Sequence, residues 1–127
     1  MLAARQKTWL ARLLIGLVFF FNVQCAVVFL AVPQQYVASF ELSGPPGEGL
    51  LFLMWNVPYA VALWNAARQR TSLYQAVVMQ AIGVVGESLL LATFPAGHAA
   101  IRESVGRFIL FDGSGLALLA LATFLSS

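Results

Sequence analysis

Charged residues are scarce in this chain, and their scarcity indicates its class. Only 9% of its 127 residues are charged, whereas 61% are hydrophobic. A soluble domain carries charge on about a quarter of its residues. So few charges cannot cover a water-facing surface of this size, which indicates that much of the surface faces lipid. The formal net charge of +2 is too small to suggest a nucleic-acid partner.

Cysteine and histidine each occur once, as Cys25 and His98. One cysteine excludes an internal disulfide and a two-cysteine redox centre. One histidine excludes a bis-histidine haem within a single chain. The sequence also shows no metal-ligand spacing, no glycine-rich phosphate loop and no hydrolase elbow. We therefore expect no metal site and name no catalytic residue.

Four apolar segments are long enough to cross a membrane. A helical span needs about 20 mostly apolar residues, and its backbone groups must be satisfied internally. The expected helices cover residues 9–32, 49–67, 72–94 and 106–126. Short loops favour antiparallel neighbours. The sequence therefore predicts an all-α fold, a single transmembrane domain over residues 1–127 arranged as an up-down-up-down four-helix bundle.

Basic residues are distributed unevenly along the chain. Five of them precede or open the first expected helix or lie between the second and third: Arg5, Lys7, Arg12, Arg68 and Arg70. Arg102 and Arg107 lie on the other side. The positive-inside rule therefore predicts a multi-pass protein of the inner (plasma) membrane with both termini in the cytoplasm.

Each expected helix carries a polar side chain in the outer half of the bilayer. At 1.5 Å per residue, Glu87 lies roughly 12 Å from the outer end of the third helix and Asp112 roughly 9 Å from the outer start of the fourth. The first and second helices contribute amides at similar depth. The predicted pocket consists of Glu87, Asp112, Asn56, Asn22, Gln24 and Gln80.

Helical spacing assigns some of these residues to common faces. Gln80, Gly83 and Glu87 lie on one face of the third helix. Asp112 and Gly115 share a face of the fourth helix, and small residues there would let the two helices approach closely. We expect both faces to point into the bundle. Pro58 removes a backbone hydrogen bond and predicts a kink beside Asn56.

When two carboxyl groups lie at the same depth in a membrane, ionising both of them costs more free energy than ionising one. Glu87 and Asp112 are expected to share a proton or to pair with a charge partner, Arg102 or Arg107. An ionisable residue inside a membrane suggests a proton, ion or ligand site. The alternative is a carboxyl group that only holds two helices together, and both interpretations of Glu87 stay open. For the amides, interhelical hydrogen bonding is the expected role.

The first third of the chain contains a short pattern of Arg12, Gly16 and Phe20, followed by Pro33, Tyr36, Phe40 and "SGPPG" at 43–47. This pattern resembles the opening half of DoxX-like membrane proteins. Members of that family are small four-helix inner-membrane proteins, and some are associated with thiosulfate or quinone oxidation or with redox-stress complexes. The second span departs from the family pattern, since it carries "MWNVPY" at 54–59 instead of an early acidic residue. The resemblance implies the fold more than the chemistry.

Three functions from different classes follow. The first is a non-enzymatic bundle that binds a small amphiphile, a quinone or a lipid, in the outer-half pocket. The second is an accessory or assembly subunit of a larger membrane complex, or of a homo-oligomer. The third is a small proton- or ion-coupled transporter that uses Glu87. An enzyme is the least favoured class, because no nucleophile–base pair or metal set is visible.

Overall fold

The computed structural model describes residues 2–31, 53–93, 95–97 and 99–127. Within these ranges the long elements are the helices α1 (Ala4–Ala31), α3 (Val57–Trp64), α4 (Arg70–Thr93) and α5 (Ala99–Leu125), and none of the described residues forms a strand. Three stretches are long and apolar enough to cross a membrane: Ala4–Val28, Arg70–Thr93 and Arg102–Leu125. The protein is thus all-helical, and its composition is compatible with a membrane protein.

Two helices begin earlier than the hydropathy of the sequence suggests. Helix α1 starts at Ala4 instead of residue 9, and α5 starts at Ala99 instead of residue 106. The added residues include Arg, Lys, Gln, Glu and Ala, which are good helix formers although most are not apolar. Hydropathy alone locates the part of a helix that suits lipid, whereas backbone hydrogen bonding continues beyond it.

The second expected helix, 49–67, is interrupted. Residues 49–52 lie outside the described part. Leu53–Trp55 is helical, Asn56 forms a turn, and the helix resumes as α3, which has 8 residues. Pro58 stands in the first turn of α3, where its missing N–H is not required. The expected break beside Asn56 is therefore present, and α3 rises only about 12 Å at 1.5 Å per residue.

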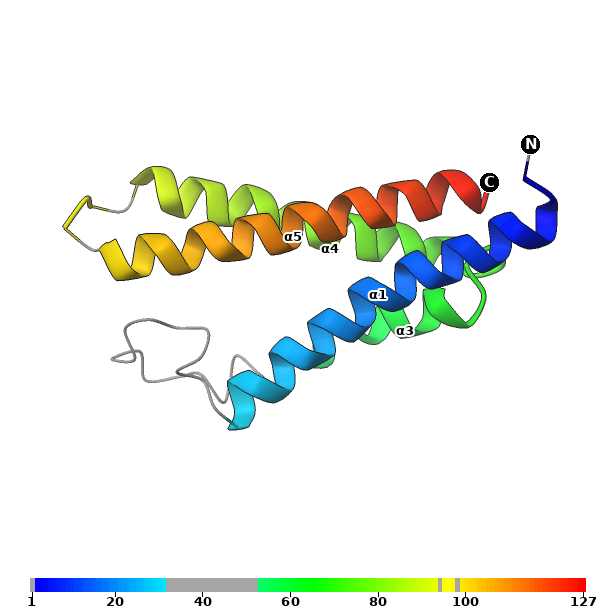
Figure 1. Ribbon diagram of the computed structural model, residues 1–127, viewed down its shortest axis with the longest axis horizontal. Helices are drawn as coiled ribbons and strands as arrows, with labels where there is room; N and C mark the ends of the chain where they lie inside the picture. The colour runs from blue at the N-terminus through cyan, green and yellow to red at the C-terminus, as the bar shows by residue number, and fades with distance from the viewer. Residues whose placement is uncertain (1, 32–52, 94, 98) are drawn as a thin grey trace.

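Successive helices run in alternating directions. Helices α1 and α4 run one way and α3 and α5 the other, so the N- and C-terminal ends lie at the same end of the molecule (Figure 1). Helix α1 contacts α3 and α5, and α4 also contacts α3 and α5. Each helix therefore has two principal neighbours.

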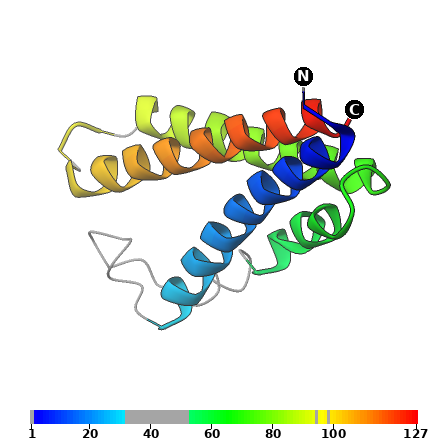
Figure 2. The same ribbon diagram turned by 45° about the vertical axis from the view of Figure 1, so that its right-hand side comes forward.

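The hydrophobic core lies toward the end that holds both termini. Its members come from all four helices and the α3–α4 connection: Ala11, Leu14, Ile15, Val18, Tyr59, Ala62, Ala66, Leu73, Ala76, Leu119 and Ala122. Toward the other end, α1 diverges from the α4–α5 pair (Figure 2). None of the described residues of α4 after Gln80 is fully buried. The core thus fills only part of the length of the bundle.

Many large apolar side chains lie on the outside. Among them, Leu110 is 73% exposed and Phe124 is 76% exposed. Water-soluble monomers rarely expose extended apolar patches, whereas lipid chains solvate such side chains favourably. The outer surface therefore fits contact with acyl chains.

Candidate polar site between the helices

A buried glutamine joins three helices where the hydrophobic core ends. The Gln80 side chain is only 3% exposed. Its Nε2 donates to Asp112 Oδ1 at 2.9 Å and to the Asp112 backbone carbonyl at 3.2 Å. Its Oε1 accepts a hydrogen bond from the Tyr59 hydroxyl. One amide thus uses both of its ends to connect α3, α4 and α5.

Tyr59 brings the first helix into the same set of contacts. Its side chain is completely buried. Besides Gln80, the hydroxyl lies 3.3 Å from the Ala76 carbonyl, which can accept its proton, and it also interacts with the buried Asn22 side chain of α1. We define the polar cluster as Asn22, Tyr59, Gln80, Glu87 and Asp112. All four helices contribute to it.

Two glycines make room for the contact between Gln80 and Asp112. A Cβ atom at Gly83 would lie 2.7 Å from Asp112 Oδ2, and one at Gly115 would lie 2.7 Å from Gln80 Nε2. Both distances are too short for a real side chain. The expected face of α4 that carries Gln80 and Gly83 therefore meets the expected face of α5 that carries Asp112 and Gly115.

Glu87 extends the polar cluster from Asp112. The two carboxyl groups are close enough to interact electrostatically. Glu87 Oε2 is buried and has no hydrogen-bond partner among the described residues. Leaving a buried polar atom unsatisfied costs about 1–3 kcal/mol.

Asp112 lies nearer the middle of its helix than the sequence suggests. The membrane-length part of α5 begins at Arg102 and ends at Leu125, so Asp112 is near its middle, about 15 Å from Arg102 at 1.5 Å per residue. Glu87 is about 9 Å from Thr93, the end of α4. Because α5 begins at Ala99, Asp112 lies farther from the start of its helix than a start at residue 106 implied, and its depth of roughly 9 Å in a membrane stays a prediction. Asp112 is therefore the more central of the two acids.

The remaining predicted residues occupy different surroundings. Asn56 is buried in the turn before α3, whereas Gln24 is exposed on α1, away from the polar cluster. Arg102 Nη1 donates to the Leu91 carbonyl at 2.7 Å and so ties α5 to the last turns of α4. Arg107 is exposed. An ion pair between either arginine and the two acids stays a prediction.

Some residues singled out in the sequence have no structural description. His98 and the residues 33–47 of the DoxX-like pattern lie outside the described ranges. Cys25 is buried. Among the described residues, no group of three or more His, Cys, Asp or Glu side chains could hold a metal ion.

Tyr59 is a member of the polar cluster that the sequence did not point to. The pocket predicted from the sequence contains only acidic and amide side chains. A phenol inside a span is itself a signal, because a buried tyrosine hydroxyl usually finds a hydrogen-bond partner. Its position within "MWNVPY", one turn after Asn56, would have placed it on the second helix.

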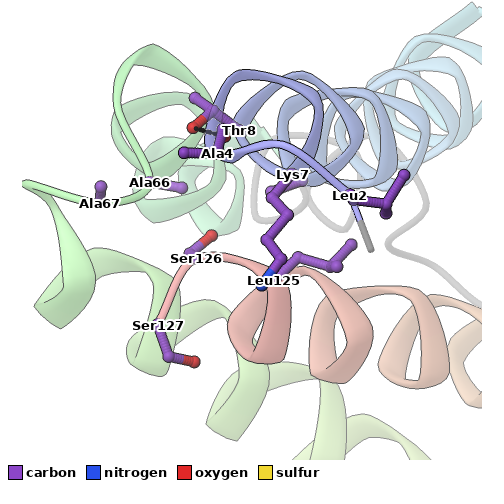
Figure 3. A pocket seen from close by; sticks show the side chains of 10 residues that line it. Leu2, Ala4, Lys7, Thr8, Ala66, Ala67, Leu125, Ser126 and Ser127 are labelled. Carbon is purple, nitrogen blue, oxygen red and sulfur yellow. Dashed lines mark hydrogen bonds between the residues drawn. The ribbon is translucent and has the colours of Figure 1, made fainter.

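Cavities also occur away from the polar cluster. One of about 260 Å³ lies between the N-terminal turn of α1, the α3–α4 connection and the last residues of α5. Figure 3 shows the Lys7 side chain reaching toward the last turn of α5. A second, of about 300 Å³, lies on the face shared by α1 and α3. The expected closed pocket around Glu87 and Asn56 stays a prediction.

Comparison with known proteins gives no relative from which a function could be transferred. No protein-family model, no curated protein and no solved structure matches this chain. The polar cluster is therefore the feature of this chain that points to a function.

Proposed function

We propose that this protein is a four-helix inner-membrane bundle that binds the polar head of a small amphiphile, such as a quinone or a lipid, beside Glu87. The observation that carries the proposal is the buried Glu87 Oε2, which has no hydrogen-bond partner in the described part of the chain. A ligand that hydrogen-bonds to this carboxyl group would relieve an unsatisfied polar atom. We also propose that a cavity beside Glu87 holds this polar head.

The proposed up-down-up-down bundle is supported by the neighbours of each helix. Helices α1, α3, α4 and α5 contact one another in cyclic order, and their directions alternate. Both termini would lie on the cytoplasmic side, because that end holds most of the basic residues. The similarity of the first third of the chain to DoxX-like proteins suggests the same architecture.

The chemistry of the polar cluster suits a ligand with a carbonyl or hydroxyl group. A protonated carboxyl group donates to a carbonyl oxygen, and an ionised one accepts from a hydroxyl group. Gln80 and Gly83 hold Asp112 in place, and Asp112 in turn contacts Glu87. The apolar tail of an amphiphile would lie among acyl chains and the outward-facing apolar side chains. Quinones have this combination of a polar ring and an apolar tail.

Glu87→Gln tests the proposal, with Glu103→Gln as its matched control. Glu103 is an exposed carboxylate on α5. We expect both variants to stay folded in mild detergent. A short-chain benzoquinone, titrated by ligand-induced thermal stabilisation, should bind Glu87→Gln about tenfold more weakly, which corresponds to about 1.4 kcal/mol. Glu103→Gln should bind it like the wild type. Equal binding by all three proteins, or no binding by the wild type, would contradict the proposal.

A second candidate, an accessory subunit of a larger membrane complex, is favoured by small residues that face outward. A Cβ atom at Gly86 or Gly113 would meet no other atom within 4 Å. Ser88 and Ser114 are exposed close to these glycines in the sequence. Small and hydroxyl-bearing residues are typical of contacts between membrane helices. Purification in mild detergent with mass spectrometry of co-purifying proteins tests this role, which Gly113→Leu should weaken.

A further inference from the structure

A groove on the outer face of α1 and α3 combines apolar walls with one arginine. It has a volume of about 300 Å³ and is lined by Trp9, Arg12, Leu13, Gly16, Leu17 and Leu63. Gly16 has no side chain to fill the groove, and Leu63 of α3 packs opposite it. Leu13 and Leu17 are both more than one-third exposed. The groove is therefore open to the surrounding lipid.

Arg12 is held at this groove by an aromatic ring and keeps its donors free. Its Cζ lies 5.5 Å from the centre of the Trp9 ring, a cation–π contact. The guanidinium makes no hydrogen bond or ion pair with the residues that the structure describes. Its five N–H donors are thus available to an oxygen-rich anion, and a guanidinium binds phosphate through two parallel hydrogen bonds.

The charge of this end of the molecule is of one sign. Arg5, Lys7 and Arg12 lie in the first half of α1, Arg68 lies in the α3–α4 connection and Arg70 begins α4. Figure 1 shows the start of α1 and the start of α4 at the same end of the molecule. The sequence contains no acidic residue in 1–40 or 49–86. An anion on Arg12 would therefore lie toward the end of the molecule that holds most of the basic residues, with no carboxylate from these segments. Basic residues next to a membrane attract anionic lipids, by about 1 kcal/mol each.

We propose that the groove binds an anionic phospholipid, with the phosphate on Arg12 and one acyl chain along Leu13, Gly16 and Leu17. The site lies at the opposite end of the core from Glu87 and does not depend on the proposed binding of a quinone. Arg70 serves another purpose, since it bonds to the Ser126 carbonyl and the Tyr74 hydroxyl. Arg12 is the basic residue that combines free donors with an apolar groove.

Native mass spectrometry of the delipidated protein in mild detergent tests this site. Dioleoyl phosphatidylglycerol should bind at least fivefold more tightly than dioleoyl phosphatidylcholine, in keeping with about 1 kcal/mol for one cation. Arg12→Gln should remove this preference, whereas Arg12→Lys should keep part of it. Arg107→Gln removes an exposed arginine from the other half of the bundle and should leave the preference unchanged. Glycerol phosphate should not compete, because it has no acyl chain.

Three outcomes would overturn the proposal. The first is equal binding of the two lipids by the wild type. The second is an undiminished preference in Arg12→Gln, and the third is an equal loss in Arg12→Gln and Arg107→Gln, which would indicate attraction to net charge alone. Circular dichroism of each variant establishes that it is folded. A binding site for free phosphate would instead appear as competition by glycerol phosphate, and this result also excludes the lipid groove.

Discussion

At the scale of single residues, Gln80 does more than any other side chain to connect the helices. It satisfies its carbonyl oxygen on Tyr59 and its amide nitrogen on Asp112. Gln80 is buried, and a buried polar group must find its hydrogen-bond partners within the protein. Gln80 can do this only because neither Gly83 nor Gly115 has a side chain to occupy the same space.

Gly83→Ala is expected to destabilise the bundle by about 1–3 kcal/mol, as overpacking does in well-packed interiors. The added methyl group would lie 2.7 Å from Asp112 Oδ2 and would force Asp112 away from Gln80. Gly86→Ala is the control on the same helix, because its methyl group would meet nothing within 4 Å. Unfolding free energies from titration with a denaturing detergent measure the difference. Equal stability of the two variants would contradict the close approach of Gly83 to Asp112.

Tyr59→Phe should lower the unfolding free energy by about 0.6–1.7 kcal/mol, the range for hydrogen bonds between membrane helices. The substitution removes the hydroxyl that bonds to Gln80 and leaves that amide oxygen without its donor. Tyr74→Phe provides the comparison, since Tyr74 is exposed and its hydroxyl only accepts a solvent-side hydrogen bond from Arg70. Its effect should stay within about 0.5 kcal/mol. A double variant with Gln80→Leu should lose less than the sum of the two single changes if the contact is direct.

At the scale of elements, the ends of the helices are tied to neighbouring helices. Arg70, at the start of α4, donates through Nη1 to the Ser126 carbonyl at 3.1 Å. Arg102, near the start of α5, donates to the Leu91 carbonyl near the end of α4. The last carbonyls of a helix lack partners within it and carry partial negative charge. Each arginine therefore satisfies an acceptor of the antiparallel neighbour at a place where α4 and α5 meet.

Arg70→Gln should loosen the C-terminal turn of α5. A cation at a helix C-terminus stabilises the helix by about 0.3–1 kcal/mol. Its loss should therefore accelerate amide exchange over residues 122–126 about two- to fivefold. Hydrogen–deuterium exchange in detergent measures this directly. Arg68→Gln removes a neighbouring exposed arginine and should leave those amides unchanged. Equal acceleration in both variants would point to net charge and not to the contact with Ser126.

At the scale of the whole molecule, the alternating helices predict which connections face the same side. Gln69 lies between α3 and α4, and Gly97 lies between α4 and α5. Figure 1 places these two connections at opposite ends. The excess of basic residues around Gln69 is the reason why we propose that this end lies in the cytoplasm.

Single cysteines introduced by Gln69→Cys and Gly97→Cys, in a Cys25→Ala background, test this topology. In right-side-out vesicles, a membrane-impermeant maleimide should label the cysteine at 97 directly and the cysteine at 69 only after permeabilisation. Both positions are exposed, so access to the reagent is limited by the membrane alone. Labelling of both from the same side would mean that α4 does not cross the membrane, and the proposed four-pass bundle would be wrong.

The amount that the sequence predicted differs between the fold and the site. Helix, membrane compatibility and the break beside Asn56 follow from local properties, because hydrophobicity and missing backbone donors act within one segment. The faces of Gly83 and Gly115 follow from helical spacing alone. The exposure of Gln24 and the membership of Tyr59 do not, since both depend on how each helix is rotated against its neighbours.

Composition and spacing by themselves determined that this chain is helical and apolar, and which residues share a helix face, because these properties arise within one segment. Only the tertiary structure decided that Gln80 lies between Tyr59 and Asp112, and that Asp112 lies near the middle of its helix. The physical reason is that such contacts depend on where each helix begins and how closely its neighbours approach. Both are set by packing between segments far apart in the sequence.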